Sequence, residues 1–88
     1  MRVELWSSSF CGACASTRAV LERAHELVPD AALTESNVAL SPAAAESDGI
    51  TATPTVIVTT DNGREVFRAV GVPTLPQVLG AVALALLD

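Results

Sequence analysis

The stretch "VELWSSSFCGAC", residues 3–14, contains both cysteines of an 88-residue chain. Along it the sequence changes from a strand pattern to a helix pattern. Residues 3–6 are β-prone and predict a strand at the start of the chain. From Cys11 onward, apolar and small side chains recur at helical spacing, so we expect a helix that ends at Pro29 and Asp30. Residues 7–10, three serines and Phe10, are then a polar loop between the strand and the helix.

The rest of the sequence predicts three more strands and two more helices. We expect a strand over 32–40, a short helix over 41–49, strands over 55–60 and 64–70, and a last helix capped by Thr74. The "DNG" turn at 61–63 predicts that the last two strands form an antiparallel hairpin.

The resulting order, βαβαββα, indicates an α/β fold. A helix joins the first two strands, so these should be parallel with a right-handed crossover. Together with the antiparallel hairpin, this predicts a mixed four-stranded sheet with helices on both faces. The length suits one domain, which we expect to cover residues 1–88.

The charge of the chain argues against two classes of partner. The formal net charge is −5, and lysine is absent from the sequence. Nucleic acids and anionic membrane surfaces both select basic patches, so we expect no binding to either. Met1 is followed almost at once by the charged, strand-like "RVELW" and not by a secretory signal, so we expect a cytoplasmic protein.

The spacing of the two cysteines favours redox chemistry. Cys11 falls at the predicted helix N-terminus, where unpaired N–H groups and the helix dipole stabilise a thiolate and lower its pKa from about 8.5. Cys14 lies nearly one turn further on, shielded by the helix, so Cys11 would attack a substrate disulfide and Cys14 would resolve the mixed disulfide. A zinc site would need further ligands, of which His25 is the only good one and lies out of reach unless two chains meet. A permanent structural disulfide would close only a small loop and stabilise little.

We expect the other charged or titratable side chains of the helices to lie on the surface of the protein. We expect His25 to be a solvent-exposed helix residue, and Arg18 to be a solvated helix charge. No metal site is predicted.

Three segments resemble the thioredoxin superfamily, and together they cover nearly the whole chain. "CGAC" at 11–14 is similar to the thioredoxin C-G-x-C motif, and "GITATPTVIV" at 49–58 resembles the segment that carries a cis-proline into the third core strand. "FRAVG" at 67–71 resembles the strand that ends in a glycine facing the active site. The resemblance implies a thioredoxin-like fold and a thiol–disulfide oxidoreductase.

The resemblance also implies roles for individual residues. Cys11 would be the nucleophile and Cys14 the resolving cysteine, with Pro54 in cis. It implies substrate contacts from the residues around them, namely Phe10, Gly12, Ala13, Thr53, Pro54, Val70 and Gly71. It implies no bound cofactor beyond the reversible Cys11–Cys14 disulfide. The implied partners are disulfide-containing proteins and an external reductase, and the implied state is a monomer.

Two departures separate this chain from thioredoxins. Leu5 stands where they carry a buried aspartate that helps to deprotonate the resolving thiol, and Ala13 replaces the proline between their cysteines. The aromatic-serine start resembles glutaredoxins instead, which leaves a protein that uses a low-molecular-weight thiol as an alternative. A non-catalytic binding module with the same fold is the other alternative.

Overall fold

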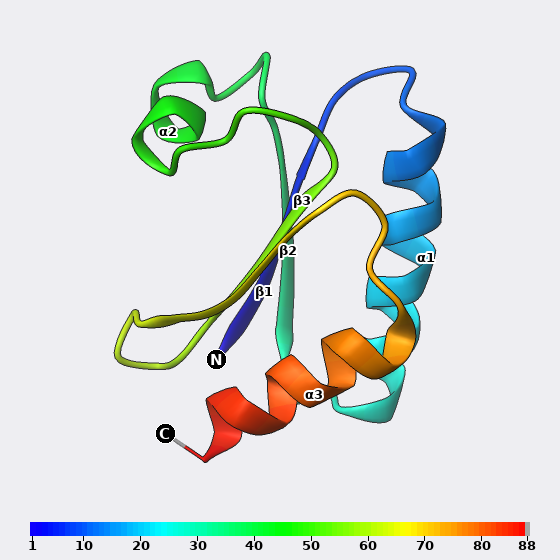
Figure 1. Cartoon of the computed structure of the whole chain (residues 1–88), viewed down its shortest axis with the longest axis vertical. Coiled ribbons are helices and arrows are strands. Elements are labelled where there is room, and N and C mark those ends of the chain that lie inside the picture. Colours follow the sequence, from blue (N-terminus) through cyan, green and yellow to red (C-terminus); the bar gives the residue numbers. More distant parts are fainter. Residues whose placement is uncertain (88) are drawn as a thin grey trace.

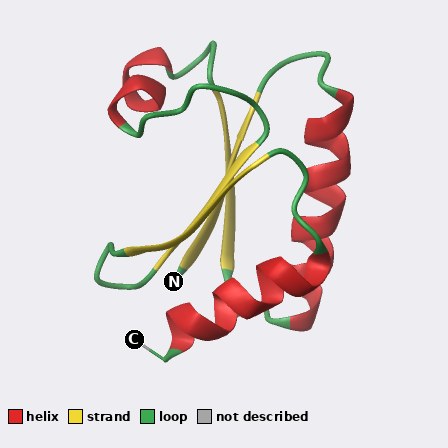
Figure 2. Cartoon of the chain, viewed as in Figure 1, coloured by secondary structure: helices red, strands yellow, loops and turns green. Residues whose placement is uncertain are grey.

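A mixed four-stranded sheet forms the centre of the molecule, with helices on both of its faces (Figure 1). The structure is a computed structural model that describes residues 1–87. Figure 2 shows the same view by secondary structure, with α1 and α3 on one side of the sheet and α2 on the other. The elements in chain order are β1 (Arg2–Ser7), α1 (Gly12–Leu27), β2 (Ala32–Asn37), α2 (Pro42–Ser47), β3 (Thr55–Thr59), β4 (Glu65–Val70) and α3 (Leu75–Leu86).

The strands lie in the order β2-β1-β3-β4. β1 and β2 are parallel, with α1 as the crossover, and β3 and β4 are antiparallel, so both predicted pairings are confirmed. β3 also pairs with β1 in the antiparallel sense, which places it beside the first strand. The ends of β1 and β2, the start of β3 and the end of β4 therefore meet at the same edge of the sheet. The cysteines follow β1 at this edge.

Strand alternation divides the apolar side chains between the two faces of the sheet. Val3 and Leu5 of β1 and Val56 and Val58 of β3 are buried in the larger core cluster, which also contains residues of α1 and α3. The intervening residues point to the other face. There Trp6 and Ile57 form a much smaller buried cluster with Ala45 of α2.

The second strand is shorter than predicted. It ends at Asn37 and not at residue 40. The Asn37 Oδ1 accepts a hydrogen bond from the Ala39 N–H at 2.8 Å, and the Asn37 carbonyl accepts from Leu40 and Ser41. This side-chain turn competes with strand extension and directs the chain into α2.

The predicted helix ends are close to those observed. Cys11 is the N-cap of α1, and the helix itself begins at Gly12. Thr74 caps α3 through a reciprocal capping box with Gln77, as its position indicated. Within residues 1–87, no helix is both long enough and apolar enough to cross a membrane.

Candidate active site

Cys11 and Cys14 form a disulfide at the N-terminus of α1, with their Cα atoms 5.2 Å apart. Cys11 has an extended backbone and accepts a hydrogen bond at its Sγ from the Cys14 N–H, at 3.0 Å. The sulfur of Cys11 thus occupies the place where a serine or aspartate oxygen usually caps a helix. In the reduced protein the same N–H would favour the thiolate over the thiol.

The two sulfurs differ in their access to solvent. Cys11 is half-buried, whereas Cys14 is only 1% exposed and packs inside the molecule. A large partner can therefore approach Cys11 but not Cys14. This asymmetry suits an outer attacking thiol and an inner resolving one.

The loop before β3 lies beside the loop that leads into Cys11, because Thr53 and Ser8 are hydrogen-bonded. The Thr53–Pro54 peptide bond is cis, and Pro54 is buried. The Pro54 carbonyl accepts a hydrogen bond from the Gly71 N–H at 2.9 Å, which ties this loop to the end of β4. Gly71 has a φ of 95°, a backbone conformation that side chains disfavour, so glycine permits the chain to turn there.

Residues 8–10 form the predicted loop, whereas Ser7 is the last residue of β1. All three serines also hydrogen-bond to residues that are distant in the chain. Ser8 Oγ lies 2.7 Å from Thr53 Oγ1 and links the loop before α1 to the loop before β3. Ser9 Oγ accepts from the Asn37 side-chain amide at 3.4 Å. Ser7, the last residue of β1, is buried and donates its hydroxyl to Glu35 at 2.8 Å.

Glu35 joins three elements behind the disulfide. Arg18 of α1 is solvated, as predicted, but it also donates two hydrogen bonds to the Glu35 carboxylate, at 2.7 and 2.8 Å. These bonds hold the pKa of Glu35 below its usual range, and the Ser7 hydroxyl acts in the same direction against the effect of burial. In the sheet Glu35 lies directly opposite Leu5. A carboxylate is therefore present beside Leu5, on the neighbouring strand.

His25 is exposed, as predicted. Its Nδ1 also donates to the Ala31 carbonyl at 2.7 Å, at the far end of α1 from the cysteines. This bond joins the end of α1 to the turn before β2, so His25 stabilises that turn and lies away from the cysteines.

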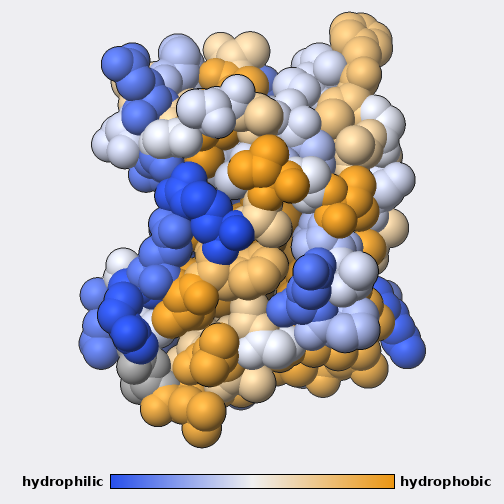
Figure 3. Space-filling view, in the orientation of Figure 1, coloured by the Kyte–Doolittle hydropathy of each residue, from blue (hydrophilic) through white to orange (hydrophobic). Residues whose placement is uncertain are grey.

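Apolar side chains are exposed immediately before Cys11 and on both sides of Gly71. The Phe10 side chain is fully exposed immediately before Cys11, and its backbone has a φ of 57°. Val70 and Val72, on either side of Gly71, are 64% and 47% exposed. Figure 3 shows white to orange atoms over the start of α1, whereas the deepest blue gathers elsewhere on this face.

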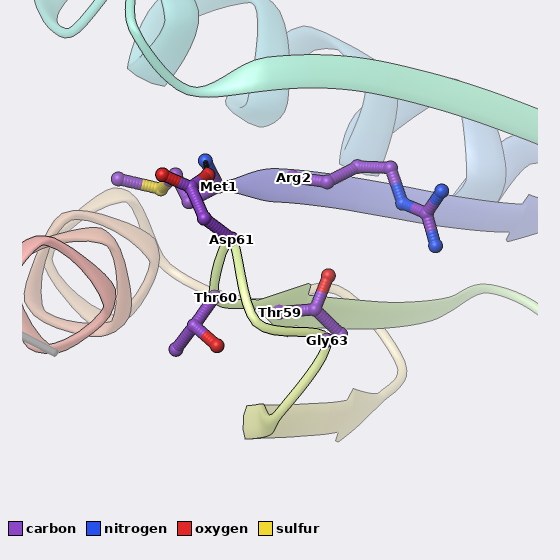
Figure 4. A pocket seen from close by; sticks show the side chains of 6 residues that line it. All are labelled: Met1, Arg2, Thr59, Thr60, Asp61 and Gly63. Carbon is purple, nitrogen blue, oxygen red and sulfur yellow. Dashed lines mark hydrogen bonds and ion pairs between the residues drawn. The ribbon is translucent and has the colours of Figure 1, made fainter.

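A hollow of about 230 Å³ opens next to the loop before β3. It is lined by Val38, Ile50, Thr51, Ala52 and Thr53. Since Thr53 adjoins Pro54 and bonds Ser8, the hollow borders the cysteine-bearing loop. A larger hollow of about 300 Å³ lies at the opposite edge of the sheet, where Asp61 pairs with the Met1 amine (Figure 4).

The structure brings most of the predicted site residues to one edge of the sheet. The disulfide and the Pro54–Gly71 bond join four of them directly. Gly12 and Ala13 are exposed in the first turn of α1. The substrate contacts of all the predicted site residues stay predictions. Sequence reasoning missed Ser7, Ser8, Arg18 and Glu35, because each acts through a partner at least 17 positions away in the chain.

Comparison with solved structures identifies the fold. Thioredoxin 1 from Thermosipho africanus is 19% identical, with a TM-score of 0.82 over 98% of this chain and 94% of that one. A mutant thioredoxin from Halobacterium salinarum is 24% identical, with a TM-score of 0.86 over 96% of this chain and 73% of that one. Fasciola hepatica thioredoxin is 25% identical, with a TM-score of 0.79 over 90% of this chain and 77% of that one. No family model matches the sequence, and no curated protein matches it at a significant level.

Proposed function

We propose that this chain, which has the thioredoxin fold, is a thiol–disulfide oxidoreductase that acts on protein disulfides through Cys11 and Cys14. The observation that carries the proposal is the asymmetry of the pair. Cys11 is accessible and caps α1, while Cys14 lies buried behind it and donates its N–H to the Cys11 sulfur. The fold likeness and the C-x-x-C spacing support the same conclusion.

The reaction begins from the reduced protein. The Cys11 thiolate attacks one sulfur of the substrate disulfide, which breaks that bond, forms a mixed disulfide and releases one substrate thiolate to be protonated by water. Cys14 then loses its proton and attacks the Cys11 sulfur. The second substrate thiolate leaves and is protonated in turn. The substrate has gained two electrons, and the protein ends with the Cys11–Cys14 disulfide.

The residues around the pair would hold the substrate chain. Thr53 would offer its backbone to an extended segment, and Val70 and Gly71 would form the other wall of the site. Phe10, Gly12 and Ala13 would contact the substrate beside Cys11, with Pro54 in cis behind them. The reversible disulfide carries the electrons without a bound cofactor. We propose that the chain acts as a monomer in the cytoplasm and that an external reductase there regenerates its dithiol.

Reduction of insulin with dithiothreitol as the electron source tests the proposal. We expect turnover by the native chain and none by a Cys11→Ser variant. A Cys14→Ser variant is the matched control, since it should attack the substrate but accumulate the mixed disulfide. Normal turnover by Cys11→Ser would overturn the proposal, and inactivity of the native chain would favour a non-catalytic binding module.

The Cys14→Ser variant also tests the low-molecular-weight alternative. Incubated with oxidised glutathione and, separately, with a disulfide-containing protein, it should form the protein adduct faster. Faster trapping of glutathione on Cys11 would instead assign a glutaredoxin-like activity.

The thiol pKa values give an independent measurement. In the reduced protein Cys11 should titrate below about 8 and Cys14 above that value, because only Cys11 caps the helix. Equal values near 8.5 would contradict the helix N-terminus argument.

A further inference from the structure

The tip of the hairpin between β3 and β4, residues 61–63, contains an asparagine followed by a glycine. All three residues of this hairpin tip are exposed. Asparagine is a thermolabile residue, because the main-chain nitrogen of the next residue can attack its side-chain amide. Gly63 has no Cβ to hinder that approach. The hairpin tip therefore holds the reacting groups of a chemical modification in contact with water.

Asn62 is less restrained than Asn37, the other asparagine of the chain. The Asn37 side chain donates to Ser9 Oγ at 3.4 Å and accepts from the Ala39 N–H at 2.8 Å. It is also followed by Val38, whose branched Cβ crowds the main chain. Within residues 1–87, the side chain of Asn62 makes no hydrogen bond. The amide of Asn62 is thus free to turn toward the next main-chain nitrogen, and that of Asn37 is held.

Thr60 holds the nitrogen that would attack Asn62. The Gly63 N–H donates to the Thr60 carbonyl at 3.0 Å, and the Arg64 N–H donates to Thr60 Oγ1 at 3.1 Å. The Thr60 N–H in turn donates to the Arg64 carbonyl at 2.9 Å. Thr60 itself is buried. Attack on Asn62 therefore requires the bond between Gly63 and Thr60 to open, and hydrogen bonds at an exposed loop open at low free-energy cost.

From these features we infer that Asn62 is a site of spontaneous deamidation, and that Thr60 sets the rate by holding the hairpin tip. The inference does not depend on the proposed function. The hairpin tip follows the end of β3, whereas the cysteines lie at the edge of the sheet where β3 begins.

The reaction consumes water and releases ammonia. The Gly63 nitrogen loses its proton to a base and attacks the Cγ of Asn62. The bond between Cγ and the side-chain nitrogen breaks, ammonia leaves with a proton taken from water, and a succinimide ring remains. Water then opens the ring at either of its two carbonyl carbons. One product is aspartate, and the other is isoaspartate, in which the main chain runs through the former side chain.

Both products alter the surroundings of the hairpin tip. A new carboxylate appears next to Asp61, whose own carboxylate pairs with the Met1 amine beside the larger hollow (Figure 4). Isoaspartate also lengthens the main chain before Gly63, so the two N–H groups that Thr60 accepts can no longer both align with it. The modification thus adds negative charge to an acidic chain and loosens the hairpin at the same position.

Incubation of the oxidised chain in a mildly alkaline buffer, followed by peptide mapping with mass spectrometry, tests the inference. Asn62 should convert to a mixture of aspartate and isoaspartate while Asn37 stays intact. The same chain unfolded in urea gives the rate without the hairpin. Asn62 should convert at least roughly tenfold faster there, because Thr60 no longer holds the attacking nitrogen.

A pair of variants tests the role of Thr60 in the folded chain. Thr60→Val keeps the size of the side chain but leaves the Arg64 N–H without its acceptor, so Asn62 should convert several-fold faster. Thr59→Val is the matched control. Thr59 is the last residue of β3, and its hydroxyl makes no hydrogen bond within the described residues, so the native rate should be kept.

The outcomes decide the two parts of the inference separately. An Asn62 that stays unmodified in the folded chain after the unfolded chain has fully converted would overturn the assignment of the site. Equal rates in the folded and unfolded native chain would overturn the role of Thr60, even where Thr60→Val does not fold. Equal rates in folded Thr60→Val and Thr59→Val would overturn that role as well.

Discussion

Phe10 combines an exposed side chain with a left-handed backbone, two features that a residue selected for stability alone would avoid. Its φ of 57° lies in a region where residues with a Cβ are disfavoured by roughly 1 kcal/mol. Its side chain is fully solvated, so packing does not offset that cost. The substrate contact that we propose for Phe10 would account for the exposed side chain.

Two substitutions at Phe10 separate the backbone cost from the contact. Because glycine tolerates a positive φ and alanine does not, Phe10→Gly should be more stable than Phe10→Ala by about 1 kcal/mol. Urea unfolding of the oxidised proteins measures this difference. Both variants should lose several-fold in kcat/KM for a protein disulfide. Full activity in both would exclude Phe10 from substrate binding, and equal stability would contradict the backbone argument.

The serines of residues 7–9 show at the residue scale what a sequence conceals. A run of serines between a strand and a helix predicts a loop, because each hydroxyl can bond locally or to water. Their actual partners come from distant strands and loops, and no local pattern encodes those partners. The place of the cysteines was predictable, by contrast, because a strand, a loop and a helix N-terminus can each be recognised from neighbouring residues in the sequence.

Ser8 should matter to the site more than Ser9. The Ser8–Thr53 bond is 2.7 Å long and partly buried, whereas the Ser9 bond is 3.4 Å long and exposed. Ser8→Ala should therefore cost about 1 kcal/mol of unfolding free energy, and Ser9→Ala close to nothing. Denaturant unfolding of the two variants measures the difference. Equal losses would show that the link to Thr53 contributes nothing specific.

At the scale of elements, β2 is joined to α1 by an ion pair that the sequence did not reveal. The exposed pattern of β2 shows little hydrophobic alternation, so neither its end nor the partner of Glu35 could be predicted. By contrast β3 is almost wholly buried and β-branched, and its hairpin with β4 follows from an Asp-Asn-Gly turn. Element type was thus predictable wherever burial imposed a pattern. The order of the strands was not, because it depends on tertiary contacts.

The ion pair predicts an acid-sensitive stability. The pKa of Glu35 is lowered in the folded chain, chiefly by its hydrogen bonds with Arg18, so the folded state binds this proton more weakly than the unfolded state does. The stabilisation is present above the unfolded pKa, about 4.3, and is lost as pH falls through the folded pKa. Glu35→Gln should consequently have a flatter profile of Tm against pH below about 4.3.

Matched variants assign that pH dependence to the pair. Arg18→Gln leaves a titrating carboxylate with only the Ser7 bond, so its profile should also be flatter than that of the native chain. Glu65→Gln is the control, because Glu65 forms a similar exposed ion pair with Arg68 on β4, the strand farthest from β2. This control variant should lose the contribution of Glu65 to the pH dependence of Tm and keep that of Glu35. Native acid sensitivity in both Glu35→Gln and Arg18→Gln would contradict the assignment.

At the scale of the whole molecule, helices cover the two faces of the sheet unequally. α1 and α3 each bury four residues, whereas α2, with six residues in all, buries Ala45 alone. In Figure 1, α2 lies apart from the two longer helices, on the other side of the sheet. The free energy that holds α2 in place is accordingly small, since few apolar contacts would be lost when it opens.

Native-state hydrogen exchange should detect this difference. We expect the amides of α2 to exchange through local opening at least roughly tenfold faster than those in the middle of α1, because their opening exposes little apolar surface. α3 is the internal control, as it is also a peripheral helix but contributes to the larger core. Equal protection of α2 and α3 would show that the small Trp6 cluster holds its helix as firmly as the large one. Since Val38 and Ile50 pack against that cluster and also line the hollow beside Thr53, opening of α2 would reshape this hollow.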